Sequence, residues 1–381
     1  MKTVKLATLC NVLSGFAFKS ELFGDKGIPV VRIRDVVRGT SNTYYSGEFD
    51  EKYILENGDI LVGMDGDFNT AYWRGGKALL NQRVCKIEVD PTKVCKKFIY
   101  YLLPLKLKKI WDDTPFVTVK HLSVKKLLDI DVPDWPLETQ KQIAAVLEKA
   151  DQLRKDCKQM EQELNSLAQS VFIDMFGDPV MNPKGFEVTK LKDLVSVLSG
   201  ATPSKSNDSF WIGDVPWVSP KDMKVAELYD AIDHVNEITF TKTNLKSIPL
   251  NSILIVVRGM ILAHTVPLAI TRKKLSINQD IKALTVKSES ITSEFLLAAL
   301  SSMHTHLLGI ISTAAHGTKR IDMADLLNIR VIVPSLKSQE EYTKAITVIR
   351  ELLANQKAEV ALHESNFKAL MQKAFKGELN L

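Results

Sequence analysis

Two aspartates in a glycine-rich turn are the side chains most able to do chemistry. Asp65 and Asp67 fall in the run Gly63 to Asp67, directly after a predicted strand. Two carboxylates at this spacing could hold a divalent metal, as a DNA nuclease requires. A glycine and aspartate cluster after a strand is also typical of an ordinary turn. The sequence contains no serine-hydrolase, phosphate-loop, zinc-peptidase or base-methyltransferase motif. We therefore expect no metal and no catalytic residue.

The chain is a tandem repeat, and the second copy lacks those carboxylates. Residues 5–15 recur at 190–200, and residues 81–82 return as 278–279. Where the first copy has its two aspartates, the second has Arg258 and Met260. Self-similarity over this length indicates two related globular units. A catalytic carboxylate pair in one copy alone is disfavoured.

Short strands and helices are predicted within each unit, which gives an α+β fold class. Strands are predicted at residues 29–33, 59–62, 84–89 and 129–132, with counterparts at 217–218, 253–257, 281–286 and 329–333. Shorter helices are predicted at 5–13, 95–111 and 119–127, with counterparts at 191–198, 293–310 and 320–327.

Each unit is followed by a long predicted helix, at residues 138–176 and 338–376. Apolar or small residues recur there at alternating steps of three and four, which predicts a heptad seam. The first seam comprises Ile143, Val146, Ala150, Leu153, Cys157, Met160, Leu164, Leu167 and Val171. The second comprises Tyr342, Ile346, Ile349, Leu353, Gln356, Val360, His363, Phe367, Leu370 and Ala374, with polar interruptions at Gln356 and His363. Two helices of equal length, each with one apolar stripe, are expected to pair within the chain.

Polar and basic side chains gather in the loops, where the two copies differ most. Residues of these types hydrogen-bond base edges and phosphates. Arg32 and Arg34 are expected on one face of the strand at 29–33. Basic groups before each long helix oppose the dipole of a predicted short helix unless an anion lies nearby. The candidate DNA contacts are Phe18, Lys19, Ser20, Arg32, Arg34, Asp65, Asp67, Asn69, Tyr72, Arg74, Lys120, Lys205, Ser206, Lys221, Arg258, His264, His316, Thr318 and Lys319. Unconstrained surface is the alternative reading of these loops.

Composition narrows the class of protein without naming it. The formal net charge of +5 is mildly basic and does not by itself require nucleic acid. The four cysteines show no CxxC pairing, so reduced thiols are expected. The longest apolar strand-like run, at residues 253–257, is far too short to span a membrane. We expect a cytoplasmic protein with no membrane partner.

Several short motifs in a fixed order resemble one known family. They are Ser-Gly-Phe-Ala-Phe-Lys-Ser at residues 14–20, Met-Phe-Gly-Asp-Pro at 175–179 and Lys-Ala-Phe-Lys-Gly-Glu-Leu at 373–379. Together with the duplication and the two long helices, they resemble the specificity subunit of type I restriction-modification systems. The second unit lacks the Phe-Ala-Phe of the first, so contacts inferred there transfer poorly between units.

The resemblance implies a domain order and a division of labour. It implies target recognition domains at residues 1–134 and 190–334, spacer helices at 135–177 and 335–381, and a linker at 178–189. The spacer helices would form an antiparallel coiled coil, each roughly 58 Å long. Each domain would read one half of a split, asymmetric sequence in double-stranded DNA. The subunit would do no chemistry and hold no cofactor. It would dock two modification subunits, which carry S-adenosylmethionine and methylate adenine, and restriction subunits would join them.

Two other classes of function stay open at this point. One is a stand-alone DNA nuclease or methyltransferase whose Asp65/Asp67 loop binds metal. The other is a coiled-coil protein scaffold that does not bind DNA. Turnover by the isolated chain would favour the first, and salt-dependent DNA affinity would count against the second.

Overall fold

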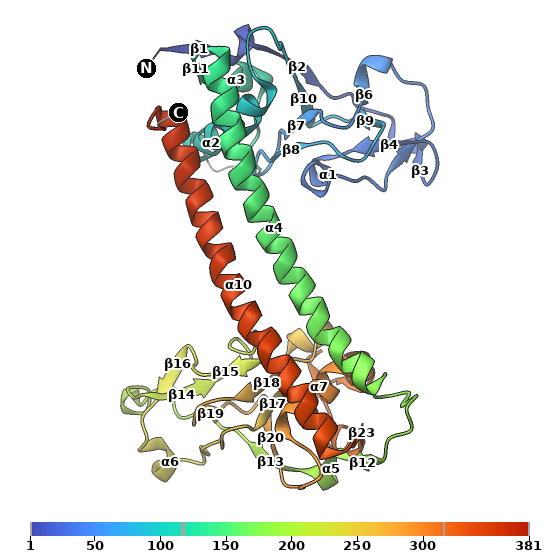
Figure 1. The fold of residues 1–381 in the computed structure, drawn as a ribbon, viewed down its shortest axis with the longest axis vertical. Coiled ribbons are helices and arrows are strands. Elements are labelled where there is room, and N and C mark those ends of the chain that lie inside the picture. Colours follow the sequence, from blue (N-terminus) through green and yellow to red (C-terminus); the bar gives the residue numbers. More distant parts are fainter. Residues whose placement is uncertain (1, 116–118, 315–316, 380–381) are drawn as a thin grey trace. The chain divides into compact units, whose positions relative to one another are not determined.

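The computed structural model describes residues 2–115, 119–314 and 317–379, and the chain divides into two compact units (Figure 1). Unit 1 consists of Met1–Lys158 and Ala358–Leu381, and unit 2 consists of Gln159–Lys357. Each long helix therefore contributes one part to each unit. None of the helices in the described part of the chain is long and apolar enough to cross a membrane.

The described part of unit 1 has a four-stranded sheet, a five-stranded sheet and three shorter helices. The four-stranded sheet has the order β2 (Cys10–Ser14), β10 (Val84–Val89), β7 (Ile60–Gly63), β8 (Thr70–Tyr72). The five-stranded sheet has the order β3 (Phe23–Gly24), β5 (Tyr44–Tyr45), β4 (Ile28–Val31), β9 (Ala78–Leu80), β6 (Ile54–Leu55). A separate pair joins β1 (Thr3–Lys5) to β11 (Asp131–Pro133). The helices are α1 (Ile33–Arg38), α2 (Lys96–Asp113) and α3 (Val124–Leu128).

Unit 2 repeats this plan with small differences. One sheet has the order β13 (Val195–Ser199), β20 (Ile281–Val286), β17 (Ile253–Val256), β18 (Leu268–Thr271), β15 (Glu227–Leu228). A second has the order β16 (Asp233–Val235), β14 (Val215–Val218), β19 (Ser276–Ile277). Two strand pairs are β12 (Val188–Lys190) with β23 (Arg330–Ile332), and β21 (Ile311–Thr313) with β22 (Lys319–Ile321). The helices are α5 (Leu191–Leu194), α6 (Thr239–Lys242), α7 (Ser293–Ser302), α8 (His304–Gly309) and α9 (Met323–Asn328).

The strand orders confirm the predicted repeat at the level of the fold. The order β2-β10-β7-β8 in unit 1 matches β13-β20-β17-β18 in unit 2. The recurring Ser-Gly pair has a steric cause, because the chain passes very close to another backbone segment at both glycines. A Cβ added to Gly15 would lie 1.9 Å from the Asn81 carbonyl oxygen, and one added to Gly200 would lie 2.1 Å from that of Ile277. Only glycine fits either position.

Several predicted short elements are wrong. The helix expected at residues 5–13 is instead β1, a single turn at Leu6–Thr8, and β2. Its counterpart at 191–198 is helical only as α5, after which β13 begins. The apolar spacing in these stretches suits either period, and sheet pairing with β10 and β20 decides for a strand. The helices expected at 119–127 and 320–327 begin later, and the one expected at 293–310 is broken between α7 and α8.

The two long helices are confirmed as α4 (Leu137–Phe176) and α10 (Leu336–Lys376), and they pack together in antiparallel fashion. In unit 1, Arg154 of α4 lies 3.1 Å from Glu364 near the end of α10. In unit 2, the end of α4 meets the start of α10, where the ring of Phe172 lies 5.7 Å from that of Tyr342. Early residues of each helix thus face late residues of the other.

The predicted seam is right for α10 and only partly right for α4. All ten seam positions of α10 are buried or half-buried. On α4, every second position is exposed: Val146 by 38%, Leu153 by 46%, Met160 by 48% and Leu167 by 46%. In unit 1, α4 packs against the globular part as well as against α10, so Leu147 and Asp151 are buried instead. The pattern therefore overestimated how much of α4 its helical partner covers.

A buried glutamine fixes each long helix to its own unit in the same way. In unit 1, the Gln140 side-chain oxygen accepts a hydrogen bond of 3.0 Å from the backbone N–H of Cys95 at the start of α2. In unit 2, Gln339 accepts one of 2.8 Å from the N–H of Thr292 at the start of α7. Gln339 also donates to the carbonyl oxygens of Ser290 and Pro334. These contacts satisfy otherwise unpaired backbone groups at a helix N-terminus.

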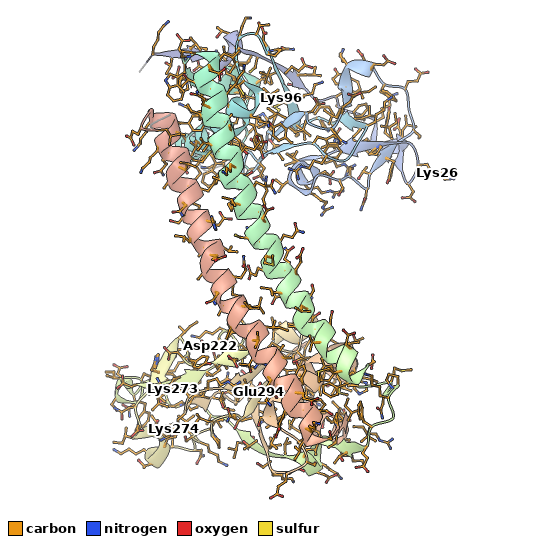
Figure 2. All side chains as sticks on the ribbon, viewed as in Figure 1. Lys26, Lys96, Asp222, Lys273, Lys274 and Glu294 are labelled. Atoms are coloured by element: carbon orange, nitrogen blue, oxygen red, sulfur yellow. The ribbon has the colours of Figure 1, made fainter. Side chains whose placement is uncertain are left out.

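Unit 2 also holds α10 through four charged side chains, which we call the Arg-Glu cluster: Arg272, Glu227, Glu294 and Arg350. Arg350 lies 3.2 Å from Glu227 and 2.8 Å from Glu294, and Arg272 contacts both glutamates. Of the four, Glu294 in the first turn of α7 is labelled in Figure 2. Their side chains are only 16–25% exposed. Burial alone would raise the pKa of Glu294, but the hydrogen bonds from Arg350 and Arg272 hold that pKa below its ordinary value.

Candidate nucleic-acid interface

Four separate segments of unit 1 meet at one end of its four-stranded sheet. The N–H of Met64, after β7, donates to the Arg83 carbonyl at 2.8 Å, before β10. The N–H of Gly66 donates to the Lys120 carbonyl at 3.1 Å. The N–H of Gln82 donates to the Phe16 carbonyl at 2.8 Å, after β2. Backbone bonds thus hold these loops together, whatever their side chains do.

Asp65 is the centre of a polar group at this end. Its carboxylate lies 2.5 Å from Nδ1 of His121 and 3.7 Å from Nε of Arg83. The Asp65 side chain is 25% exposed, whereas those of Arg83 and His121 are 55% and 48% exposed. The Asp65 carboxylate is therefore in contact with both neighbours, whereas the side chains of Arg83 and His121 face solvent.

Within the described residues, no group of three or more His, Cys, Asp or Glu side chains is placed to hold a metal ion. Asp67, the second carboxylate of the proposed metal loop, is exposed.

Lys120 is held inside the protein instead of being free to reach a phosphate. Its ammonium group donates to the Trp111 carbonyl at 2.5 Å and lies 3.7 Å above the centre of the Trp111 ring. The indole N–H of Trp111 in turn donates to the Gly66 carbonyl at 2.9 Å. Lys120 thus braces the loop that carries Asp65.

The prediction that Arg32 and Arg34 share one face of a strand is wrong. Strand β4 ends at Val31, Arg32 is the residue that caps α1, and Arg34 lies in that helix. The buried Asp35 carboxylate accepts a hydrogen bond of 3.0 Å from the Arg32 N–H, which begins the helix. The Arg32 guanidinium lies 5.0 Å from the centre of the Phe23 ring, and Arg34 remains exposed.

Two predicted aromatic contacts belong to the core. Phe18 is only 6% exposed, and its ring lies 4.8 Å from that of Tyr45. Tyr72 stacks on Tyr100 at 4.1 Å, and burial raises the pKa of its phenol. Phe16, which is not among the candidate contacts, is 47% exposed. The other predicted positions of unit 1 are exposed: Lys19, Ser20, Asp67, Asn69 and Arg74.

Unit 2 has an equivalent site with different side chains. The N–H of Val257 donates to the Asp280 carbonyl at 2.8 Å, and that of Gly259 donates to the Lys319 carbonyl at 3.0 Å. Arg258 forms a backbone bridge to Arg320, as Asp65 does to His121. The same bonds therefore equate Arg258 with Asp65, Asp280 with Arg83, and Arg320 with His121.

The remaining predicted positions of unit 2 are scattered. Lys205, Ser206 and His264 are exposed. Lys221 lies 2.7 Å from Asp233, and this hydrogen-bonded ion pair raises the pKa of Lys221. Lys319 donates to the Thr313 hydroxyl at 2.8 Å, and Thr318 is half-buried. His316 lies outside the described residues.

Four residues of these sites were missed as candidates: Arg83, Asp280, His121 and Arg320. The repeat contained the signal for the first two, because Asn81-Gln82 aligns with Asn278-Gln279 and so sets Arg83 against Asp280. His121 and Arg320 directly follow Lys120 and Lys319, which were selected. Opposite charges at matched positions were the feature to look for.

Comparisons with known proteins agree with this architecture. The model of the family described as "Type I restriction modification DNA specificity domain" matches residues 1–166 and 183–362. The chain is 30% identical to the type I restriction enzyme EcoBI specificity subunit of Escherichia coli, over 99% of this chain and 85% of that protein. It is 24% identical to the MjaVIII specificity subunit of Methanocaldococcus jannaschii, over 87% of this chain and 81% of that protein.

A solved structure shows the same fold. The S subunit of a type I restriction-modification system from M. genitalium superposes with a TM-score of 0.63, covering 98% of this chain and 96% of that chain at 15% identity. Specificity subunits recognise DNA and carry no catalytic activity of their own. The family match spans both units and nearly all of the chain, so this protein belongs to the specificity subunits of type I restriction-modification systems.

Proposed function

We propose that the chain reads a bipartite, asymmetric site in double-stranded DNA, one half with each unit. One observation carries the proposal. The two units keep the same backbone bonds at the loop end of their sheets, yet present Asp65, Arg83 and His121 in one case and Arg258, Asp280 and Arg320 in the other. A shared frame with different hydrogen-bonding groups suits two readers of different base sequence.

The proposed recognition domains are residues 1–134 and 190–334, with spacer helices at 135–177 and 335–381 and a linker at 178–189. Strand pairing supports these limits. In unit 1, β1 pairs with β11 just before α4 begins, and in unit 2, β12 pairs with β23 just before α10 begins. Each globular part is thus closed by its own first and last strands. The helices of 40 and 41 residues that join the readers are expected to set the gap between half-sites.

The proposed DNA contacts are the predicted residues that remain exposed. In unit 1 these are Lys19, Ser20, Arg34, Asp67, Asn69 and Arg74, and in unit 2 they are Lys205, Ser206, Lys221, Arg258 and His264. Lysine, arginine and hydroxyl groups of this kind bind phosphates and fix register, while the loop amides and guanidinium groups can reach base edges. The chain itself needs no cofactor for this role.

We also propose that the chain docks two modification subunits and, through them, restriction subunits. The exposed apolar side chains of α4 support this role, because they recur every seven residues and so lie along one face of the helix, where a partner protein would cover them. Val146 and Leu153 lie in unit 1, and Met160 and Leu167 lie in unit 2. Each unit therefore offers one such pair. S-adenosylmethionine is expected on the modification subunit. The assembly is expected in the cytoplasm, where chromosomal DNA is.

The test is to co-express the chain with its modification subunit and map methylated adenines in the host genome, with and without this chain. We expect one motif with two defined half-sites, present only when the chain is present. Methylation without a sequence preference would overturn the proposal.

Two controls address the other classes of function. The isolated chain, incubated with DNA and Mg²⁺, is expected to show no turnover, and the variant Asp65→Asn/Asp67→Asn should behave alike. Affinity of the complex for DNA is expected to fall steeply with salt as counterions are released. Salt-independent behaviour would favour a protein scaffold.

A further inference from the structure

The equivalent sites of the two units differ by an exchange of charge. In unit 1, the loop after β7 carries the carboxylate, Asp65, and the turn before β10 carries the guanidinium, Arg83. In unit 2, the loop after β17 carries the guanidinium, Arg258, and the turn before β20 carries the carboxylate, Asp280. The backbone bonds that join loop and turn are the same, at 2.8 Å in both units. One arginine and one aspartate are thus kept, and the arginine changes loops.

Exposure indicates which member of each pair faces outward. The Arg83 side chain is 55% exposed and that of Asp65 is 25% exposed. Arg258 is exposed, whereas Asp280 is half-buried and accepts a hydrogen bond of 3.1 Å from Asn278. In unit 1, the Asp65 carboxylate lies near Nε of Arg83, and Nη1 of Arg83 lies 3.4 Å from Nδ1 of His121, so Nη2 is the nitrogen that these two neighbours leave to a ligand. The arginines are therefore the outward-facing groups. In unit 1 the Asp65 carboxylate lies against Arg83 and can position it.

The backbone of Arg83 supplies a second, independent observation. Arg83 has a φ of +70°, in the left-handed region that favours glycine and asparagine. It occupies the third position of a turn closed by the Val84 N–H donating to the Asn81 carbonyl at 3.2 Å. Glycine or asparagine would suit this turn better. An arginine kept in an unfavourable conformation indicates a functional role for its side chain.

The surroundings of Arg258 point to an anionic or electron-rich ligand. Burial and the charge of Arg258 together lower the pKa of Lys282, so two cations lie close to each other there. Arg320 is a second exposed positive group beside Arg258, whereas Lys282 is half-buried and its ammonium group donates to the Ser199 hydroxyl at 2.9 Å. A guanidinium among like charges is well placed to meet the acceptor-rich edge of a base next to phosphates.

We propose that Arg83 and Arg258 each read a guanine, in the half-sites of unit 1 and unit 2 respectively, with Asp65 as the positioning residue of Arg83. This inference rests on the proposed function of the chain. Arginine donates two parallel hydrogen bonds to guanine O6 and N7, and each such pair discriminates against other bases by about 5- to 150-fold. Because the arginine comes from a different loop in each unit, the two readers place it differently on their DNA.

The experiment uses the complex with the modification subunits and a duplex that carries the wild-type motif. Arg83→Ala is expected to lose the preference for one guanine in one half-site, by about 5- to 150-fold in competition with duplexes substituted there. The other half-site should be read as before, which also shows that the variant is folded. Arg258→Ala should give the converse result.

Further variants separate base reading from charge. Arg83→Lys keeps the charge but not the paired geometry, so it is expected to lose the preference as well. Asp65→Ala should relax the same guanine as Arg83→Ala, and the double variant should be no worse than Arg83→Ala alone. Lys93→Ala and Lys287→Ala, beyond the far ends of β10 and β20, are the controls that should leave the motif unchanged.

The outcomes distinguish the two levels of the argument. If the wild-type complex has a bipartite motif but Arg83→Ala and Arg258→Ala leave it unaltered, the inference fails and the proposed function stands. Full preference in Arg83→Lys would also overturn the inference, since a phosphate contact would then explain the effect. Without any motif in the wild type, the proposed function itself fails.

Discussion

Units 1 and 2 share their supporting residues and differ in their outward-facing ones. Gly15 and Gly200 accommodate the same close approach, and Gln140 and Gln339 accept the same hydrogen bond from a helix N-terminus. At the loop end of the sheet, by contrast, aspartate and arginine have changed places between the two copies. In this fold, the residues that support each unit and the residues proposed to read DNA are therefore separate sets. The second set differs between the two copies, while the first set is shared.

The units also differ in how they hold the long helices. Unit 2 uses the Arg-Glu cluster, in which two arginines face two glutamates. Unit 1 uses Arg154, which lies 2.6 Å from Asp151 on its own helix and 3.1 Å from Glu364 on α10. Variants at matched positions can therefore test which parts of the two units are interchangeable.

The largest expected effect comes from the matched aromatic cores. Phe98 and Phe295 are both fully buried, and each packs on the last turns of a long helix, at 5.2 Å from Phe375 and 4.9 Å from Phe176. Phe98→Ala and Phe295→Ala should each lower the free energy of unfolding by about 3–5 kcal/mol through the cavity left behind. Chemical denaturation of the full chain measures both. Losses of unfolding free energy that differ between the two variants by more than about 2 kcal/mol would contradict the equivalence of the two cores.

The next largest expected effect is a difference between the units in how much their charged contacts with the long helices contribute to the free energy of unfolding. Arg350→Met leaves two largely covered carboxylates sharing Arg272, and is expected to cost about 2–3 kcal/mol, below the roughly 3–5 of fully buried pairs. Arg154→Met should cost less, about 1–2 kcal/mol, because Lys155 still pairs with Asp151. Lys337→Met, on the exposed surface of α10, serves as the control within about 0.5 kcal/mol. Equal costs for the two arginines would contradict the distinction.

The buried glutamines should show a smaller difference in the same direction. Gln339→Ala removes three hydrogen bonds and is expected to cost about 2 kcal/mol, whereas Gln140→Ala removes two and should cost about 1 kcal/mol. Equilibrium unfolding again provides the measurement. A more costly Gln140→Ala would mean that helix N-termini, and not the number of bonds, control these contacts.

The smallest expected effect is on how the free energy of unfolding depends on acid pH. The pKa values of Glu294 and Glu364 are both held below their ordinary value by neighbouring cations, which outweigh burial. Stability from such groups is present above the unfolded-state pKa and is lost as pH falls through the lower folded-state pKa. Glu294→Gln should flatten the fall in unfolding free energy below about pH 4.5 by about 1 kcal/mol. Glu364→Gln should do less, since that side chain is 25% exposed against 16%.

The long helices and the two related units could be predicted from the sequence because the patterns that indicate them extend over many residues. Forty residues of α4 repeat one periodicity, and the duplication presents each unit twice. The short segment at residues 5–13 could not be assigned, because its apolar spacing suits a helix and a strand equally and the partner strand β10 decides. The exposure of Val146 and Leu153 was likewise missed, because a heptad pattern does not state how many neighbours share a helix.

The candidate site was predictable in composition and not in geometry. Loop residues of the right types were identified, but Asp65 is paired with His121, which lies 56 positions away. Burial removed Phe18 and Tyr72 from the candidates, because an aromatic side chain in a loop sequence can equally complete a core. The turn that makes Arg83 unusual is a backbone property, which residue types alone do not reveal.

The division of unit 1 into two segments has a consequence for synthesis. Its core contains Met371 and Ala374 of α10, which are 6% and 0% exposed, beside Ile143 and Leu147 of α4. All of unit 2 is translated before those residues leave the ribosome. Domains generally fold from the N-terminus onward during translation, but here unit 2 can be completed first. The nascent first unit must wait with part of its apolar surface uncovered, which is the stage at which chaperones would be expected to bind.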